Sequence, residues 1–114
     1  MSSCLFCRIV EGTIPADIVF QDEHALAFRD INPQAPVHIL IIPKRHVASL
    51  HDSVHEDRDL LACLLLLCKE IAHRQGLADS GYRVVTNVGR DAGQTVLHMH
   101  LHVLGGRHLS WPPG

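Results

Sequence analysis

The sequence predicts an α+β fold: a five-stranded antiparallel sheet with a long central helix and a short N-terminal helix. Segments with the apolar, often β-branched composition of strands lie toward both ends of the chain, and helix signals lie between them. Strands are expected at residues 18–21, 25–29, 37–42, 82–88 and 96–106. With 114 residues, 46% of them hydrophobic, the chain suits one domain spanning 1–114 with one hydrophobic core.

Local sequence signals set the elements of the N-terminal half. The short helix is expected at residues 4–11, because Gly12 is suited to end it. The polar turn 22–24 separates the first two strands. Prolines and an asparagine make residues 30–36 a loop. The third strand is apolar on both faces, as is typical of a central buried strand, and Pro43 ends it.

The long helix is expected to begin near Ser53 and to end near Gly76. Ser53 and Glu56 have the spacing of a capping box, and glycine commonly follows the end of a helix. Residues 60–68 are apolar on every side of this helix, which is more than one small sheet is expected to cover. We therefore expect a second chain to bury part of it; the alternative is a helix wrapped completely within its own domain.

Composition narrows the class of protein and its compartment. The net charge of −2, with no basic run, argues against nucleic-acid or membrane-surface partners. The apolar run 60–68 has nine residues, well short of the ~20 of a membrane span. Residues 1–15 lack the basic start and long apolar stretch of a secretory signal. The four cysteines are then expected in a reducing cytoplasm, as free thiols or metal ligands rather than disulfides.

Three histidines alternate with apolar residues at positions 98, 100 and 102. In a strand this spacing places His98, His100 and His102 on one face, with their apolar neighbours on the other. Such a row has three interpretations: coincidence on a solvated face, a metal site, or phosphoryl or nucleotidyl transfer by a histidine nucleophile. Gly89 and Gly93 favour transfer, because glycines let backbone amides approach phosphate oxygens.

The alternation at residues 98–104 matches the His-φ-His-φ-His-φ-φ signature of the histidine triad (HIT) superfamily, where φ is apolar. The chain resembles this superfamily over nearly its whole length. Further agreement lies at residues 28–36, 42–46, 87–89, 93–95, 105–107 and 111–114. The Trp-Pro-Pro-Gly end resembles the Hint branch rather than the dinucleoside polyphosphate hydrolases.

The resemblance implies a HIT-like fold that pairs into a homodimer, and a purine nucleoside phosphoramidase activity. Such an enzyme hydrolyses AMP or GMP joined to an amine, and aminoacyl adenylates, through a covalent nucleotidyl-histidine intermediate. His100 would be the nucleophile, and a neutral imidazole is competent for that role at pH 7. His98 and His102 would donate to phosphate oxygens or to the departing amine. Thr95, where many relatives carry serine, would complete the catalytic set beside the phosphate.

The resemblance also implies a nucleotide site. Its members would be Asp30, Ile31, Asn87, Gly93, Gln94, Thr95, His100, His102, Phe6, Ile9, Ile14, Phe28 and Trp111. Asp30 would bind the ribose hydroxyls, although a loop-capping aspartate explains it equally well. Asn87 is a turn residue or a phosphate or ribose contact. Four of the apolar members are either core residues or the lining of a base pocket: Phe6, Ile9, Ile14 and Phe28. The tail 105–114 would contribute to the dimer and the rim of the site.

Cys4 and Cys7 form a Cys-x-x-Cys pair, which suits a redox couple, half of a zinc site, or two small buried thiols. In many bacterial relatives, positions matching His46 and His98 complete a structural Cys₂His₂ zinc site. The resemblance therefore implies a possible structural zinc ion that catalysis does not require. Cys63 and Cys68, on different faces of the long helix, are expected in the core.

A second hypothesis comes from another functional class. The protein would be a nucleotide-binding dimeric adaptor whose hydrolysis is incidental and whose dimer surface binds other proteins. The intact triad favours the enzyme, because an adaptor has no need of a nucleophile.

Overall fold

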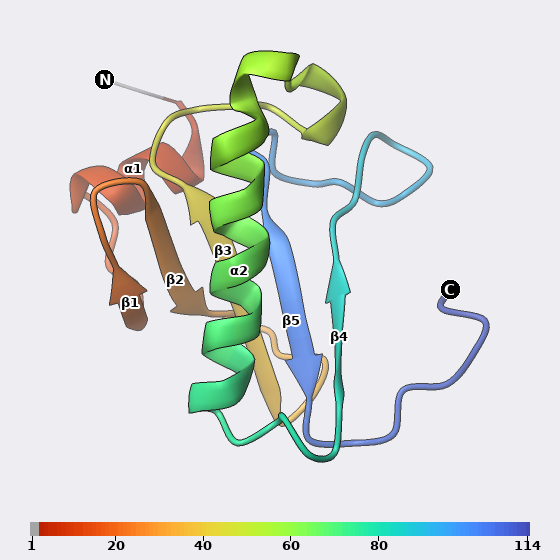
Figure 1. The fold of residues 1–114 in the computed structure, drawn as a ribbon. Helices are drawn as coiled ribbons and strands as arrows, with labels where there is room; N and C mark the ends of the chain where they lie inside the picture. Colours follow the sequence, from red (N-terminus) through yellow and green to blue (C-terminus); the bar gives the residue numbers. More distant parts are fainter. Residues whose placement is uncertain (1–2) are drawn as a thin grey trace.

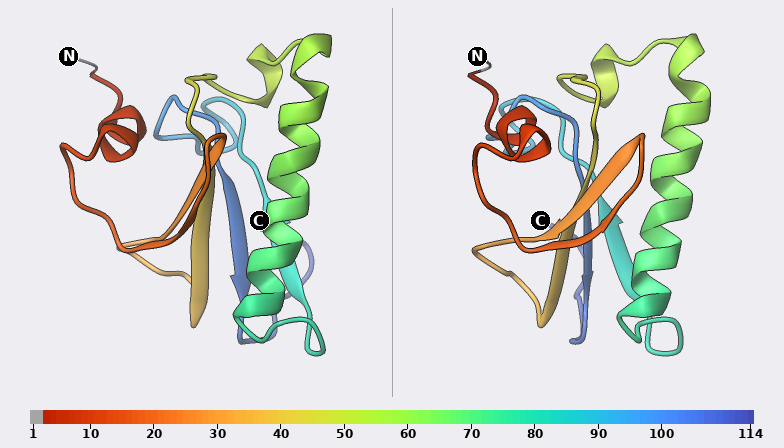
Figure 2. Two further views of the ribbon diagram at one scale, coloured as in Figure 1. Left: turned by 60° about the vertical axis from the view of Figure 1, so that its left-hand side comes forward. Right: turned by 90° about the vertical axis from the view of Figure 1, so that its left-hand side faces the viewer.

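The fold is an antiparallel sheet of five strands in the order β1-β2-β3-β5-β4, with helices on both faces (Figures 1 and 2). The computed structural model describes residues 3–114. The elements are α1 (Leu5–Glu11), β1 (Ile18–Gln21), β2 (Ala25–Arg29), β3 (Val37–Pro43), α2 (Arg58–Arg74), β4 (Tyr82–Val85) and β5 (Leu101–Gly105). Every neighbouring pair of strands is antiparallel. The predicted fold class is therefore confirmed.

Strand alternation divides the core into two layers, one on each face of the sheet. Figure 2 shows α2 against one face and α1 near the other. In β2, Ala25 and Ala27 pack in the layer that includes residues of α2, whereas Leu26 and Phe28 pack with residues of α1. On the α1 face, Leu40 of β3 lies opposite His102 of β5. The histidine-rich part of the chain is thus next to the short helix, away from α2.

The short N-terminal helix forms nearly where the sequence predicts it. Cys4 is its N-cap, and the Cys4 sulfur accepts a hydrogen bond from the Cys7 backbone N–H at 3.3 Å. Gly12 ends α1 with a φ of 83°, a left-handed conformation that glycine adopts without steric cost. The same turn that starts the helix therefore brings the two cysteines together.

The start of α2 differs from the prediction. The helix begins at Arg58, after 3₁₀ turns at Leu50–Asp52 and His55–Asp57, so the predicted capping box of Ser53 and Glu56 is wrong. The Ser53 hydroxyl donates to the Leu50 carbonyl at 2.6 Å, which commits it to the preceding turn. The Asp57 carboxylate instead accepts the backbone N–H of Val54 at 2.9 Å. Gly76, with a φ of 76°, follows the end of α2 as expected.

Two strands are shorter than predicted. β4 ends at Val85, and the hydroxyl of the next residue, Thr86, donates to the His100 carbonyl at 2.8 Å. β5 begins only at Leu101, so placing all three histidines in one regular strand is wrong: only His102 lies in β5. The backbone N–H of Met99 donates to the Val47 carbonyl at 2.6 Å, in the segment after β3, rather than to a strand of the sheet. The alternation nevertheless persists, with Met99 packed in the layer that contains residues of α2.

The long helix leaves part of its apolar surface uncovered within one chain. Leu65 and Leu66 are 57% and 64% exposed, whereas Leu64 is fully buried. Cys68 is buried as expected, but Cys63 is exposed, so its predicted core position is wrong. Within residues 3–114, no helix has both the length and the apolar character needed to cross a bilayer.

Candidate active site

A cavity of about 380 Å³ lies on the α1 face of the sheet, where the histidine-rich segment meets α1, β2 and β3. It brings together nine of the residues predicted for the nucleotide site. They are Phe6, Ile9, Ile14, Phe28, Asp30, Ile31, Thr95, His100 and His102. These residues are far apart in the sequence, so the fold assembles the site from separate segments.

The cavity has an apolar part and a polar part. The Phe6 and Phe28 rings meet edge to face with centroids 5.5 Å apart, and Phe6 meets the His100 ring in the same way at 5.1 Å. Phe6 and Phe28 are both buried in the apolar layer on this face of the sheet. An apolar slot of this kind suits a flat ring, while the histidines and Asp30 offer hydrogen bonds to a polar group joined to it.

Four predicted contacts do not line this cavity: Asn87, Gly93, Gln94 and Trp111. The Gln94 side chain is bound elsewhere: it accepts the Gly89 N–H of its own loop at 3.0 Å and donates to the Ala48 carbonyl, in the segment after β3, at 2.8 Å. Trp111 is 81% exposed, in the tail that runs past β4 (Figure 1). Within a single chain, the tail thus stays away from the rim of the cavity.

His100 is held in one tautomer by the backbone. Its Nδ1 lies 2.7 Å from the His98 carbonyl oxygen, and a carbonyl only accepts hydrogen bonds, so Nδ1 carries the ring proton. The ring is 93% buried, since its exposed fraction is 7%. In the neutral form Nε2 therefore has a free lone pair, which is the requirement for a histidine nucleophile.

His102 is paired with a histidine that the sequence analysis did not single out. The Nδ1 of His102 lies 2.8 Å from Nε2 of His38, which in turn lies 3.4 Å from an Asp30 carboxylate oxygen. Burial, together with the charges of His100 and His38, lowers the pKa of His102 to about 4. Burial also lowers the pKa of His38, so both rings are neutral at pH 7. Their contact is therefore a hydrogen bond between neutral imidazoles.

His98 does not line the cavity but faces Cys4, Cys7 and His46. Its Nδ1 lies 3.3 Å from the Cys4 sulfur, 3.5 Å from the Cys7 sulfur and 3.2 Å from Nδ1 of His46. The His98 Nε2 donates to the Pro43 carbonyl at 2.8 Å, which leaves Nδ1 unprotonated and directed at the sulfurs. The structure thus brings together all four predicted metal ligands.

The spacing of these four atoms fits a tetrahedral metal ion. With Zn–S bonds of about 2.3 Å and Zn–N bonds of about 2.0–2.1 Å, the ligand atoms of such a site stand about 3.3–3.8 Å apart. The four ligand atoms lie within 4.8 Å of one another, and the Cys7 sulfur and Nδ1 of His46 are 3.4 Å apart. Two sulfurs and two imidazole nitrogens are also the donor set that zinc prefers.

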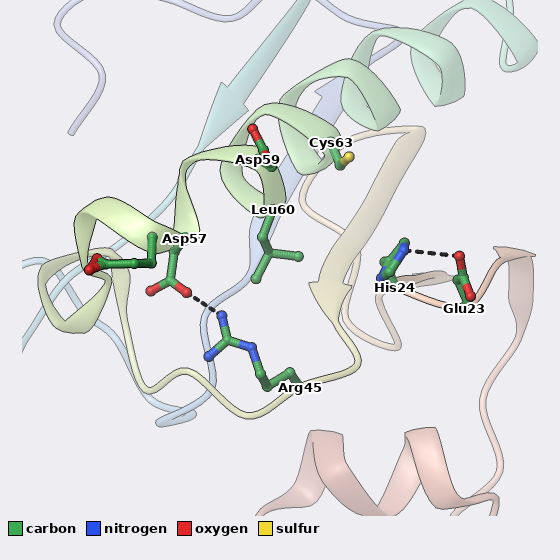
Figure 3. Close-up of a pocket in the computed structure, with 8 residues that line it drawn as sticks. Glu23, His24, Arg45, Asp57, Asp59, Leu60 and Cys63 are labelled. Atoms are coloured by element: carbon green, nitrogen blue, oxygen red, sulfur yellow. Dashed lines mark hydrogen bonds and ion pairs between the residues drawn. The ribbon is translucent and has the colours of Figure 1, made fainter.

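A separate hollow of about 310 Å³ lies at the start of α2 and contains none of the predicted site residues (Figure 3). Its charged groups largely pair with one another. Glu23 contacts His24 at 3.1 Å, and Arg45 contacts Asp57 (Figure 3). The histidine-lined cavity is therefore the better candidate for an active site.

Comparisons with known proteins show the family of this chain. The HIT domain family model matches residues 11–109. An uncharacterised HIT-like protein of Synechococcus elongatus is 54% identical over 110 residues, which are 96% of this chain and 96% of that protein. A HIT family hydrolase from Legionella pneumophila is 54% identical, with a TM-score of 0.97 over 98% of this chain and 100% of that chain. A histidine triad nucleotide-binding protein from Candida albicans is 37% identical, with a TM-score of 0.81 over 89% of this chain and 73% of that chain.

Proposed function

Since the chain belongs to the HIT domain family, we propose that it is a Hint-branch hydrolase that cleaves purine nucleoside 5′-phosphoramidates and aminoacyl adenylates. The observation that carries the proposal is the geometry of His100. Its ring lines a cavity that has an apolar slot, and its Nδ1 proton is bound to the His98 carbonyl. A lone pair is thus available beside a space suited to a purine nucleotide.

The proposed reaction has two displacements at phosphorus. The purine lies in the apolar slot, and Asp30 accepts hydrogen bonds from the ribose hydroxyls. Nε2 of His100 forms a bond to the α-phosphorus as the bond to the amine breaks, and the amine takes a proton from water. Water then attacks the same phosphorus and the bond to His100 breaks, releasing AMP or GMP. Donors from His102 and Thr95 stabilise charge on the phosphoryl oxygens in both steps.

Turnover of a panel of nucleotide–amine conjugates tests this function. The panel contains AMP and GMP joined to the same amine, an aminoacyl adenylate, and the matching pyrimidine conjugates. We expect hydrolysis of both purine conjugates and the aminoacyl adenylate, and weaker activity on the pyrimidines because a smaller base fills less of the apolar slot. Tight binding of AMP without hydrolysis of any conjugate would support the adaptor hypothesis instead.

We also propose that Cys4, Cys7, His46 and His98 hold a structural zinc ion. When bound, the ion would join α1, the loop after β3 and the segment before β5, and the first and last of these also line the active-site cavity. All four protein ligands are then used, so no position remains for a substrate, and catalysis does not depend on the ion. Thiolate ligands must stay reduced, which agrees with the cytoplasmic location expected from the sequence.

The proposed enzyme is a homodimer that pairs through the exposed side of α2. Leu65 helps to line an apolar cavity of about 170 Å³ with Leu50, Leu61 and Met99. Burying the exposed Leu50, Leu65 and Leu66 in a second copy stabilises the pair by roughly 25 cal/mol per Å² of apolar area. Light scattering at micromolar concentration should therefore give the mass of two chains, and Leu65→Glu should shift it toward one. A monomeric wild type would contradict this part of the proposal.

A further inference from the structure

We infer that Cys4 and Cys7 form a reversible oxidation site: hydrogen peroxide joins their sulfurs in a disulfide, and the disulfide loosens α1 from the segments beside it. The two residues stand at the start of α1, which helps to line the active-site cavity. The inference rests on the proposed function only where it concerns nucleotide affinity. It rests on the proposed metal site only where it concerns zinc content.

The start of α1 places the two sulfurs within reach of each other. Cys4 is the N-cap and Cys7 the third helical residue, and the Arg8 N–H closes the turn by donating to the Cys4 carbonyl at 3.1 Å. Residues three apart on one helical turn have Cα atoms roughly 5 Å apart, inside the range of about 4.4–6.8 Å that disulfides span. The two sulfurs lie within 4.8 Å of each other. Side-chain rotation can therefore form the bond while the turn stays intact.

The pair is accessible to a small oxidant. Cys4 and His46 line a hollow of about 500 Å³, and both cysteines of the pair are partly exposed. Cys68 differs, because it is buried and its burial raises the pKa of the thiol to about 11, which leaves it unreactive. Cys63 is exposed but lies outside the four-residue cluster. Cys4 and Cys7 thus combine access with a neighbouring sulfur.

The oxidation takes two electrons from the two thiols. The sulfur of one cysteine attacks an oxygen of hydrogen peroxide, the O–O bond breaks, and a sulfenic acid and one water form. The sulfur of the other cysteine then attacks the sulfenic sulfur, the S–O bond breaks, and a second water leaves. Two thiols and one peroxide thus give one disulfide and two waters, which carry away both thiol protons. A dithiol reductant such as dithiothreitol reverses the change by thiol–disulfide exchange.

The disulfide removes contacts that hold the start of α1 against its neighbours. In the reduced chain, Nδ1 of His98 lies 3.3 and 3.5 Å from the two sulfurs, and Nδ1 of His46 lies 3.4 Å from the Cys7 sulfur. Once bonded to each other, the sulfurs carry neither a proton to donate nor the negative charge of a thiolate ligand. Two imidazoles would then remain, fewer than the four ligands of a structural zinc site.

Phe6 connects this change to the active site. It lies between the two cysteines in the sequence, and its ring meets the His100 ring at 5.1 Å and the Phe28 ring at 5.5 Å between centroids. Ile9, also from α1, lines the same cavity. A less firmly held α1 spends a smaller fraction of time in the position that completes the apolar slot. The apparent affinity for a nucleotide falls in proportion to that fraction.

The test treats the full reduced chain with a small excess of hydrogen peroxide and afterwards with dithiothreitol. Intact mass and peptide mapping detect a disulfide between Cys4 and Cys7, and hydrogen exchange follows the amides of α1. We expect a mass lower by two hydrogen atoms, exchange in α1 faster by about 10-fold and a Kd for AMP higher by about 10-fold, all restored by dithiothreitol. A colorimetric chelator should detect the release of bound zinc during the oxidation.

Cys63→Ser is the matched control and should respond as the wild type does, because both sulfurs of the pair remain. Cys7→Ser cannot form the disulfide and should not lose two hydrogen atoms. Oxidation of Cys63 while Cys4 and Cys7 stay reduced would overturn the inference, as would a disulfide that leaves exchange in α1 unchanged. Mass and exchange need neither zinc nor substrate. A wild type that binds no zinc or no AMP would therefore count against those proposals and not against this one.

Discussion

His100→Ala is expected to lower turnover of an AMP–amine conjugate by a factor on the order of 10⁴ or more, while AMP binding changes little. The loss is large because the variant removes the only protein atom that bonds to phosphorus in the proposed reaction. Binding persists because the apolar slot and Asp30 are still present. Single-turnover kinetics with calorimetric titration of AMP measure the two effects separately.

The matched control for this experiment is His73→Ala, which changes an exposed histidine in the last turn of α2. It should retain wild-type turnover and AMP affinity. Equal rates for His100→Ala and wild type would refute His100 as the nucleophile. A loss of turnover that is matched by an equal loss of AMP affinity would also contradict it, because the residue would then act in binding alone.

Removal of zinc is expected to lower the melting temperature by on the order of 10–20 °C. The ion would join three segments, and at about 1,000 times its Kd a ligand of the native state adds about 4 kcal/mol of stability. Cys4→Ser should lose both the zinc and the added stability. Metal analysis and thermal unfolding before and after chelation provide the measurements.

Cys63→Ser is the control for the zinc experiment, because Cys63 is exposed and lies outside the four-residue cluster. It should keep one zinc ion per chain and the same melting temperature. Wild-type protein that contains no zinc after purification in zinc-supplemented medium would refute the metal proposal. Equal zinc content in Cys4→Ser and wild type would refute these ligands.

The sequence predicts the elements well where the signal is local. Gly12 ends α1 and Gly76 follows α2 as expected, because both need a left-handed backbone that glycine favours. The lengths of β4 and β5 depend on hydrogen bonds between residues that are distant in the sequence. Thr86 bonds to His100 and Met99 bonds to Val47, and a local sequence pattern cannot predict such bonds. The predicted capping box is wrong because the Ser53 hydroxyl donates to the Leu50 carbonyl of the preceding turn.

Much of the site is predictable from the histidine motif, but the residues that contact the motif from other strands are not. The alternation in residues 98–102 correctly predicts that His100 and Met99 lie on opposite faces of the sheet. His100 lines the cavity and Met99 packs with residues of α2, although the chain there is not a regular strand. His38 was missed because one histidine in an apolar strand gives no sign of its partner. Its contact with His102 exists only because β3 and β5 pair in the observed register, with Leu40 opposite His102. Trp111 was predicted in the site from its motif, but it lies exposed in the tail after β5 and does not line the cavity.

The stereochemical course at phosphorus tests the central claim, that the nucleotide passes through a covalent bond to a histidine. The substrate is an AMP phosphoramidate made chiral at the α-phosphorus by sulfur substitution and hydrolysed in ¹⁸O-labelled water. Each in-line displacement inverts the phosphorus, so two steps through His100 predict net retention of configuration. Net inversion would mean that water attacks the substrate directly, and it would contradict the account.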